Sequence, residues 1–207
     1  MGHNAGMNRL PLSRLSSFAL CVALLAGCAS APRAPLAQGP VADYRNNIEL
    51  NGRLSVNYDK DGKQDTISVK FNWQQQGERI DVGLASPLGQ TVATITVTPQ
   101  SATLIQAGKA PRSAADIDAL TADTLGWSLP VGGLRDWLQG YATAAGGARF
   151  AASPANNSVT TSDGWHLTFV SWQDGGAHPA PKRIDATRAA TAATGELAIR
   201  IVIDAQG

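Results

Sequence analysis

Alternation of apolar and polar residues with a period of two is the feature that most constrains this chain, because it recurs from Ile48 to Val97. In the first run, Ile48, Leu50 and Leu54 share one face, and polar residues occupy most of the positions between them. A period of two is typical of a strand that is buried on one side only. We expect strands at residues 48–58, 67–73, 80–84, 93–97 and 102–106. Turn residues at 59–62 and 75–77 predict hairpins between the first three.

The apolar spacing becomes helical after the fifth of these strands. Ser113 is predicted to cap a helix whose apolar positions are Ile117, Leu120 and Leu125. A second short helix is expected to carry Leu134, Trp137 and Leu138 and to end near Gly140. A further short helix is expected at residues 41–47, just before the first strand.

Strand patterns return in the last third of the chain. We expect strands at residues 149–153, 158–161, 165–172 and 197–204, and a weaker pattern indicates another at 183–186. The order of meanders, a helical insertion and more strands predicts a mainly β (α+β) fold. It favours a single curved antiparallel sheet with a few helices covering its inner side.

The N-terminal segment has the pattern of a secretory leader. Arg9 and Arg14 precede the apolar block 18–26, which is too short to cross a bilayer as a permanent helix, since that takes about 20 residues. Leu25-Ala-Gly-Cys28 resembles the bacterial lipobox. That resemblance implies cleavage before Cys28, diacylglycerol on the Cys28 sulfur and a third acyl chain on the new amino terminus. We therefore expect a lipoprotein signal peptide at 1–27, a lipidated flexible tether at 28–40 and one domain at 41–207.

Charge and cysteine content exclude several function classes. Lys and Arg (17) nearly balance Asp and Glu (16), so nothing indicates a nucleic-acid partner. Cys21 would leave with the leader and Cys28 would carry lipid, so no thiol remains for a disulfide, a metal or nucleophilic catalysis. His166 and His178 are isolated and are interpreted as surface residues, so we expect no catalytic site, metal or cofactor. The low charged fraction of 16% leaves open whether apolar surface or the use of small residues explains it.

The loop Ser86-Pro-Leu-Gly-Gln-Thr91 has a leucine at its centre. Pro87 fixes one backbone angle and Gly89 permits unusual ones, so the loop should have a defined shape. From these residues alone, packing of Leu88 back onto the sheet is favoured over exposure to an apolar partner.

Six sequence blocks occur in the order and spacing found in the LolB family of outer-membrane lipoprotein receptors. They are Phe71-Asn-Trp-Gln-Gln75, Ser86-Pro-Leu-Gly-Gln-Thr91, Leu125-Gly-Trp-Ser-Leu-Pro130, Leu134-Arg-Asp-Trp-Leu-Gln-Gly140, Asp163-Gly-Trp165 and Ile199-Arg-Ile-Val-Ile-Asp204. The resemblance spans most of residues 41–204. It departs from the family after Asp204, where a tryptophan is often found, so barrel closure at that edge is expected to differ. The Thr- and Ala-rich segment 186–194 has no clear counterpart.

The resemblance implies an open β-barrel around an apolar cavity, with short helices as a lid. It implies a monomer, anchored in the outer membrane and facing the periplasm, that accepts acylated lipoproteins from the soluble carrier LolA and inserts them into that membrane. In the family, the loop matching Pro87, Leu88 and Gly89 protrudes with an apolar tip, which assigns these residues to membrane insertion. Because LolA lacks a lipid anchor, Cys28 favours the receptor over the carrier.

The apolar inner-face residues are the candidates for lining the acyl cavity. They are Val69, Phe71, Trp73, Leu84, Ile95, Val97, Leu134, Trp137 and Leu138. Periodicity leaves open whether they fill the interior or line a hollow. A packed interior would favour a structural or assembly lipoprotein that binds a protein partner, and a hydrolase acting on the cell envelope is the weakest alternative.

Overall fold

The computed structural model describes residues 1–3, 37–60, 63–125, 130–191 and 195–205. The chain divides into two units, Met1–Ala34 and Pro35–Gly207. All described buried hydrophobic residues belong to the second unit, which therefore has a complete core of its own. Most of the predicted signal peptide, Cys28 and most of the predicted tether lie outside the described residues.

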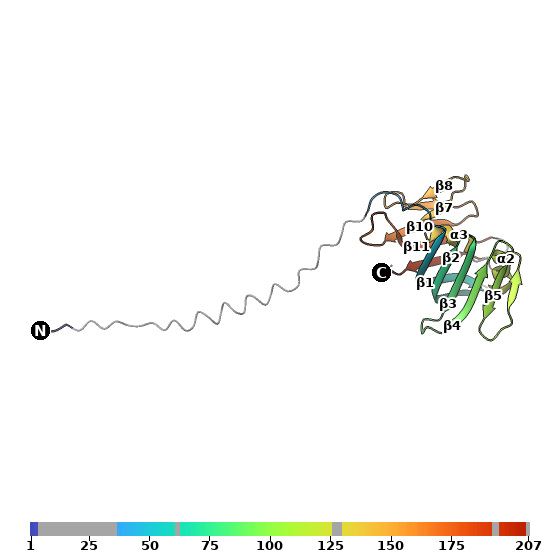
Figure 1. Ribbon diagram of the computed structural model, residues 1–207, viewed down its shortest axis with the longest axis horizontal. Coiled ribbons are helices and arrows are strands. Elements are labelled where there is room, and N and C mark those ends of the chain that lie inside the picture. Colours follow the sequence, from blue (N-terminus) through green and yellow to red (C-terminus); the bar gives the residue numbers. More distant parts are fainter. Residues whose placement is uncertain (4–36, 61–62, 126–129, 192–194, 206–207) are drawn as a thin grey trace. The chain divides into compact units, whose positions relative to one another are not determined.

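Ten strands form one antiparallel sheet in the order β6-β5-β4-β3-β2-β1-β12-β11-β10-β9 (Figure 1). In chain order, they are β1 (Asn47–Lys60), β2 (Lys63–Gln76), β3 (Arg79–Ala85), β4 (Thr91–Val97), β5 (Ala102–Gln106), β6 (Arg112–Ala114), β9 (Ser158–Thr160), β10 (His166–Trp172), β11 (Pro181–Arg188) and β12 (Leu197–Ile203). The sheet is open, because its two end strands, β6 and β9, do not pair with each other in the described part of the chain. The predicted large antiparallel sheet is confirmed, including the weakly indicated strand at 183–186, but the strand predicted at 149–153 lies outside it.

The last strand lies in the middle of the sheet, where β12 pairs with both β1 and β11. The backbone N–H of Asp204 still donates to the carbonyl of Asn51 at 2.9 Å, just beyond the end of β12. The expectation that residues near Asp204 close an edge is therefore wrong. Pairing of the first long strand with the last places the chain's C-terminal strand at the centre.

Two helices and a small hairpin lie between β6 and β9 in the chain. They are α2 (Ile117–Leu125), α3 (Val131–Trp137), β7 (Tyr141–Thr143) and β8 (Arg149–Ala151), the last two forming a separate two-stranded sheet. Helix α2 packs on β5 and β6, and α3 contacts α2 and β7. The chain thus connects the two ends of the large sheet through elements that pack beside it.

Two local predictions are wrong. Ser113 belongs to β6, and Asp116 caps α2 instead, because its Oδ1 accepts a hydrogen bond from the backbone N–H of Ala119 at 2.7 Å. The helix predicted at 41–47 is absent, since residues 41–46 form no helix and β1 begins at Asn47. The N–H of Val41 donates to the carbonyl of Ala152 at 3.0 Å, so this segment is held by distant parts of the chain.

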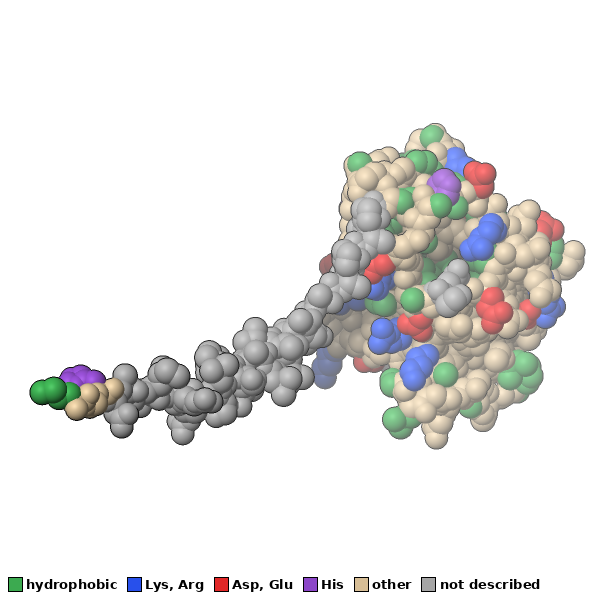
Figure 2. Space-filling model, turned by 60° about the vertical axis from the view of Figure 1, so that its left-hand side comes forward, with side chains coloured by type: hydrophobic (Ala, Val, Ile, Leu, Met, Phe, Trp, Pro, Cys, Tyr) green, Lys and Arg blue, Asp and Glu red, His purple; other side chains and the backbone are tan. Residues whose placement is uncertain are grey.

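The period-two pattern reproduces the observed burial. In β1, for example, Ile48, Leu50, Leu54 and Val56 are buried, while Glu49, Asn51 and Arg53 are exposed. One face of the sheet therefore builds the core, and the other faces solvent. Figure 2 shows one side of the protein, on which charged side chains are separated by wide uncharged areas.

Candidate functional site

An apolar cavity of about 30 Å³ lies between helix α3 and the inner face of the sheet. A cavity of this size holds roughly one water molecule. Pockets for small molecules usually measure about 300 Å³ or more. The part of the interior that these described residues line is therefore nearly filled, and α3 supplies side chains that fill it.

Most of the predicted cavity residues meet at this place. Those lining it are Phe71, Trp73, Leu84, Ile95, Leu134 and Leu138. Val69 and Val97 are half-buried and lie outside the lining. Trp137 is buried on a different side of α3, where its ring meets that of Trp165 edge-on, with centroids 5.8 Å apart.

Four further residues line the cavity and were missing from the predicted set: Leu54, Val82, Val131 and Ile201. Leu54, Val82 and Ile201 occupy the same alternating phase as their strand neighbours, so the sequence pattern already carried the signal for them. Val131 is the first residue of α3, and its position becomes apparent only once the helix boundary is known.

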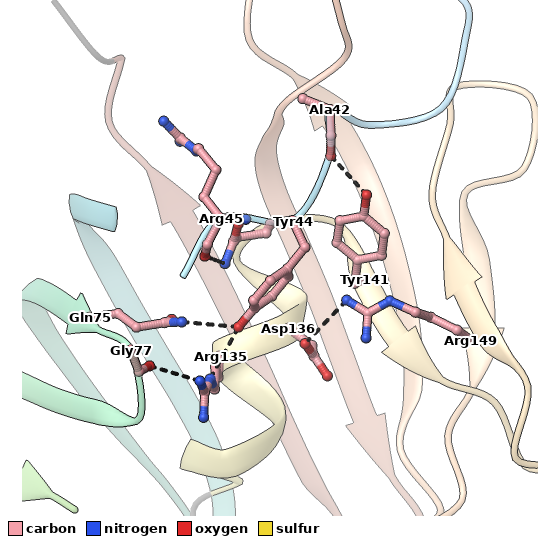
Figure 3. Close-up of polar contacts among 10 residues, drawn as sticks. Ala42, Tyr44, Arg45, Gln75, Gly77, Arg135, Asp136, Tyr141 and Arg149 are labelled. Atoms are coloured by element: carbon pink, nitrogen blue, oxygen red, sulfur yellow. Dashed lines mark hydrogen bonds and ion pairs between the residues drawn. The ribbon is translucent and has the colours of Figure 1, made fainter. Parts of the chain in front are cut away.

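Polar contacts hold α3 against the sheet at its C-terminal end (Figure 3). Arg135 donates from Nε to the hydroxyl of Tyr44 at 3.1 Å and from Nη2 to the carbonyl of Gly77 at 2.8 Å. The same hydroxyl accepts a hydrogen bond from Nε2 of Gln75 at 3.0 Å. Tyr44 therefore joins the helix to β2 through its single oxygen atom.

We call residues 41–46 the N-terminal strap, because this segment makes several contacts with α3 and the residues after it. Gln139 bonds both backbone groups of Arg45, at 2.9 and 3.0 Å. The hydroxyl of Tyr141 donates to the carbonyl of Ala42 at 2.8 Å. The guanidinium of Arg149 lies over the Tyr141 ring, 4.5 Å from its centroid. Sequence reasoning missed this network, because isolated polar residues show no periodic signal.

The loop between β3 and β4 presents Leu88 to solvent, with 90% of the residue exposed. The N–H groups of Ser86 and Gly89 close the loop by donating to the carbonyls of Gln90 and Ser86, both at 2.8 Å. Gly89 has φ +88°, which side-chain-bearing residues rarely adopt. The preference for Leu88 packing back onto the sheet is therefore wrong, and its role in membrane insertion stays a prediction.

The sequence of this chain matches a known protein family. The family model described as outer membrane lipoprotein LolB matches residues 46–205. The chain belongs to the LolB family.

Relatives called outer-membrane lipoprotein LolB match over nearly their whole length. That of Cupriavidus necator is 38% identical over 193 residues, covering 92% of this chain and 95% of the relative. That of Thiobacillus denitrificans is 33% identical over 194 residues, covering 93% and 97%. A solved LolA superfamily protein from Nitrosomonas europaea matches with a TM-score of 0.44 and 7% identity, over 76% of this chain and 84% of that one. The family assignment rests on the sequence matches.

Other predicted features of this LolB-family chain are located as follows. His166, exposed at the start of β10, lies 3.3 Å from Oγ of Ser158, and His178 is exposed in a loop. Within the described residues, no group of three His, Cys, Asp or Glu side chains could hold a metal ion. In that same part of the chain, no helix has the length and apolar character needed to cross a membrane. Residues 126–129 of the family block Leu125–Pro130, including Trp127, lie outside the described residues.

Proposed function

We propose that this chain is a lipid-anchored receptor of the outer membrane that accepts acylated lipoproteins from a LolA-like periplasmic carrier and inserts them into that membrane. The observation that carries the proposal is the apolar cavity between α3 and the sheet in a member of the LolB family. Transfer needs no bond chemistry, because acyl chains move toward whichever site removes more apolar surface from water. Residues 1–27 would be the signal peptide, Cys28 the lipid site and 28–40 the tether of a monomer.

The small cavity volume means that α3 must move before an acyl chain can enter. Val131, Leu134 and Leu138 project from α3 and its C-terminal end into the space that the chain would occupy. Withdrawal of the helix would expose the apolar lining of β1, β2, β3, β4 and β12, and an acyl chain would then replace the helix side chains. The helix is thus a lid whose own apolar residues keep the empty site closed.

Leu88 would engage the bilayer during release. Its side chain is almost fully exposed, and burying a leucine is worth about 1.5–3 kcal/mol. A free-energy gain of this size keeps membrane binding by the loop reversible, as repeated use of the receptor requires.

Transfer of a fluorescent triacylated lipopeptide from its soluble carrier to residues 35–207 tests the proposal. We expect stoichiometric transfer without nucleotide. A Leu88→Glu variant should accept the lipopeptide from the carrier but deliver less of it to phospholipid vesicles. Absence of both transfer and binding, with circular dichroism showing a folded domain, would contradict the receptor.

The second candidate is a structural or assembly lipoprotein with a packed core that binds a protein partner. The cavity of only about 30 Å³ among the described residues beneath α3 is the observation that favours it. Failure of residues 35–207 to bind any acyl probe would support this candidate.

A further inference from the structure

A second concave site lies beside the Leu88 loop, on the outer side of the sheet. It is a groove of about 260 Å³ to which β1, β2, β12 and Pro87 all contribute. Arg53, Lys70 and Arg200 are its charged lining residues, and Ser55 and Ser68 lie between them. The groove shares one lining residue, Leu54, with the interior cavity, but its charged residues do not line that cavity, and the proposed acyl transfer does not use them.

Strand register explains why the basic side chains gather next to the loop. Lys70 pairs with Ala85, the last residue of β3 before the loop, and Arg53 pairs with Lys70 from the other side. Arg53 and Lys70 are both exposed. Neither side chain has a hydrogen-bond or ion-pair partner in the part of the chain that the structure describes.

The remaining charges near the groove do not cancel this excess. Arg183 and Arg200 both bind Asp185, at 2.5 and 3.3 Å. One carboxylate therefore faces two guanidinium groups, while Arg53 and Lys70 add two uncompensated positive charges. The outer surface beside the loop is locally basic although the whole chain is nearly neutral.

We propose that this groove binds the phosphate of a phospholipid headgroup while Leu88 enters the apolar layer beneath. Pro87 lines the groove and directly precedes Leu88 in the chain. The Cα atoms of these two residues are therefore only about 3.8 Å apart, so the groove lies next to the inserted tip. Phosphates lie just above the acyl chains of a bilayer, at the level where the groove would then be. The inference rests on the proposed membrane role of Leu88 and adds the chemical group that the adjacent surface recognises.

Leu88 alone cannot hold the domain at a membrane, so a second attraction to the bilayer is needed, and this supports the phosphate assignment. Even a myristoyl chain alone gives only marginal membrane binding, and one leucine side chain is much smaller. A basic surface supplies the missing attraction, with each Lys or Arg near an anionic membrane strengthening binding about fivefold. The pair of signals would also orient the outer face of β1 and β2 toward the bilayer at the moment of release.

Co-sedimentation of residues 35–207 with vesicles of phosphatidylcholine, with and without phosphatidylglycerol, tests the groove. The Arg53→Gln/Lys70→Gln variant should bind phosphatidylglycerol vesicles about 25-fold more weakly than the unchanged domain, and added salt should reduce the difference. The Arg45→Gln/Arg79→Gln control removes the same charge near the start of β3, the end away from the Leu88 loop, and should bind within about twofold of the unchanged domain. Equal binding by the groove variant and the unchanged domain would overturn the proposal.

Two further arms separate the possible failures. Leu88→Ser should weaken binding to both vesicle types while leaving the salt dependence in place. Inorganic phosphate alone, titrated without vesicles, should give no saturable NMR shifts at Arg53 and Lys70, and saturation there would replace the lipid assignment with a free-phosphate site. The groove variant should still accept the lipopeptide from its carrier, because its substitutions lie outside the interior cavity. If the unchanged domain itself fails in the transfer assay, the proposed receptor function is overturned, whereas the vesicle-binding result still tests the groove.

Discussion

Nε of Arg135 donates a hydrogen bond to the hydroxyl of Tyr44 at 3.1 Å, across 91 positions of the sequence. This contact joins helix α3 to the N-terminal strap, which directly precedes β1. The helix that fills the interior is therefore secured by a segment at the start of the domain. Loosening that segment should make the interior easier to open.

A Tyr44→Phe substitution tests this attachment. It removes the oxygen that accepts hydrogen bonds from Arg135 and Gln75 and leaves both donors without that partner. Loss of a buried hydrogen-bond partner lowers the free energy of unfolding by about 1–3 kcal/mol. We also expect faster uptake of a fluorescent fatty acid, measured by stopped-flow fluorescence.

Tyr58→Phe is the matched control, because the Tyr58 hydroxyl donates to Asp65 in an exposed hairpin. Its effect on the free energy of unfolding should stay within about 0.5 kcal/mol. Unchanged stability and uptake in Tyr44→Phe would show that the strap does not restrain the helix.

Leu134→Ala should change stability and acyl binding in opposite directions. Leu134 lines the small cavity and is 7% exposed, so truncation should lower the free energy of unfolding by about 2–5 kcal/mol. The enlarged cavity should bind a fluorescent fatty acid more tightly. Ile105→Ala, at a position that is 49% exposed, should alter neither quantity appreciably. Weaker acyl binding by Leu134→Ala would contradict a cavity closed by α3.

Gly140→Ala should disrupt the end of α3. Gly140 has φ +84°, and an added Cβ would lie 2.5 Å from Cγ1 of Val41 in the strap. Gly164→Ala provides the comparison, since Gly164 has φ +85° and no atom within 4 Å of the added carbon. Both variants carry the backbone strain, and the crowding at Gly140 should lower its unfolding free energy by about 1–3 kcal/mol more. Equal decreases in the unfolding free energy of the two variants, measured by urea denaturation, would show that Val41 moves aside without cost and would contradict this prediction.

Stability should depend on the ionisation of Asp185 in acid. Partial burial acts to raise its pKa, but hydrogen bonds and charges from Arg183 and Arg200 outweigh burial and hold the pKa below its ordinary value of 3.8. A depressed pKa in the folded state contributes stability above the unfolded value, and that contribution disappears as pH falls through the folded one.

The Asp185→Asn variant measures this contribution. The stability difference between the unchanged domain and the variant should be present at neutral pH and shrink below pH 3.8. Asp118 acts in the opposite direction, because burial and the nearby Asp116 and Asp163 raise its pKa. Because Asp118 is present in both the unchanged domain and Asp185→Asn, its contribution cancels when their stabilities are compared at the same pH. A difference that grows on acidification would contradict the assigned ion pairs.

Much of the sheet was predictable from the sequence, because burial on one face imposes a period of two. The alternating phase placed Phe71, Trp73 and Ile95 on the inner face, and the structure brings them together around the cavity. The same phase predicts nothing about the order of distant strands. The pairing of β12 with β1 could therefore not be predicted, and the expectation of a sheet edge near Asp204 was wrong.

Features set by a few specific contacts were not predictable. The exposure of Leu88 depends on a loop closed by backbone hydrogen bonds, whereas composition alone favoured packing onto the sheet. The N-terminal strap around Tyr44 is held in place by hydrogen bonds to single polar atoms, which leave no periodic signal in the sequence. The expectation of a helix at residues 41–47 was therefore wrong. Cavity volume depends on how side chains of α3 fit the sheet, and alternation is the same for a full and a hollow interior.

The decisive measurement of the proposed lid movement is the distance between α3 and the sheet before and after an acylated lipopeptide is bound. Residues 35–207 contain no cysteine, so spin labels can be attached at Gly132→Cys on α3 and Thr94→Cys on the outer face of β4. Both positions are exposed. We predict that binding of the lipopeptide moves the labels apart as the helix leaves the interior. An unchanged distance with the lipopeptide bound would contradict it.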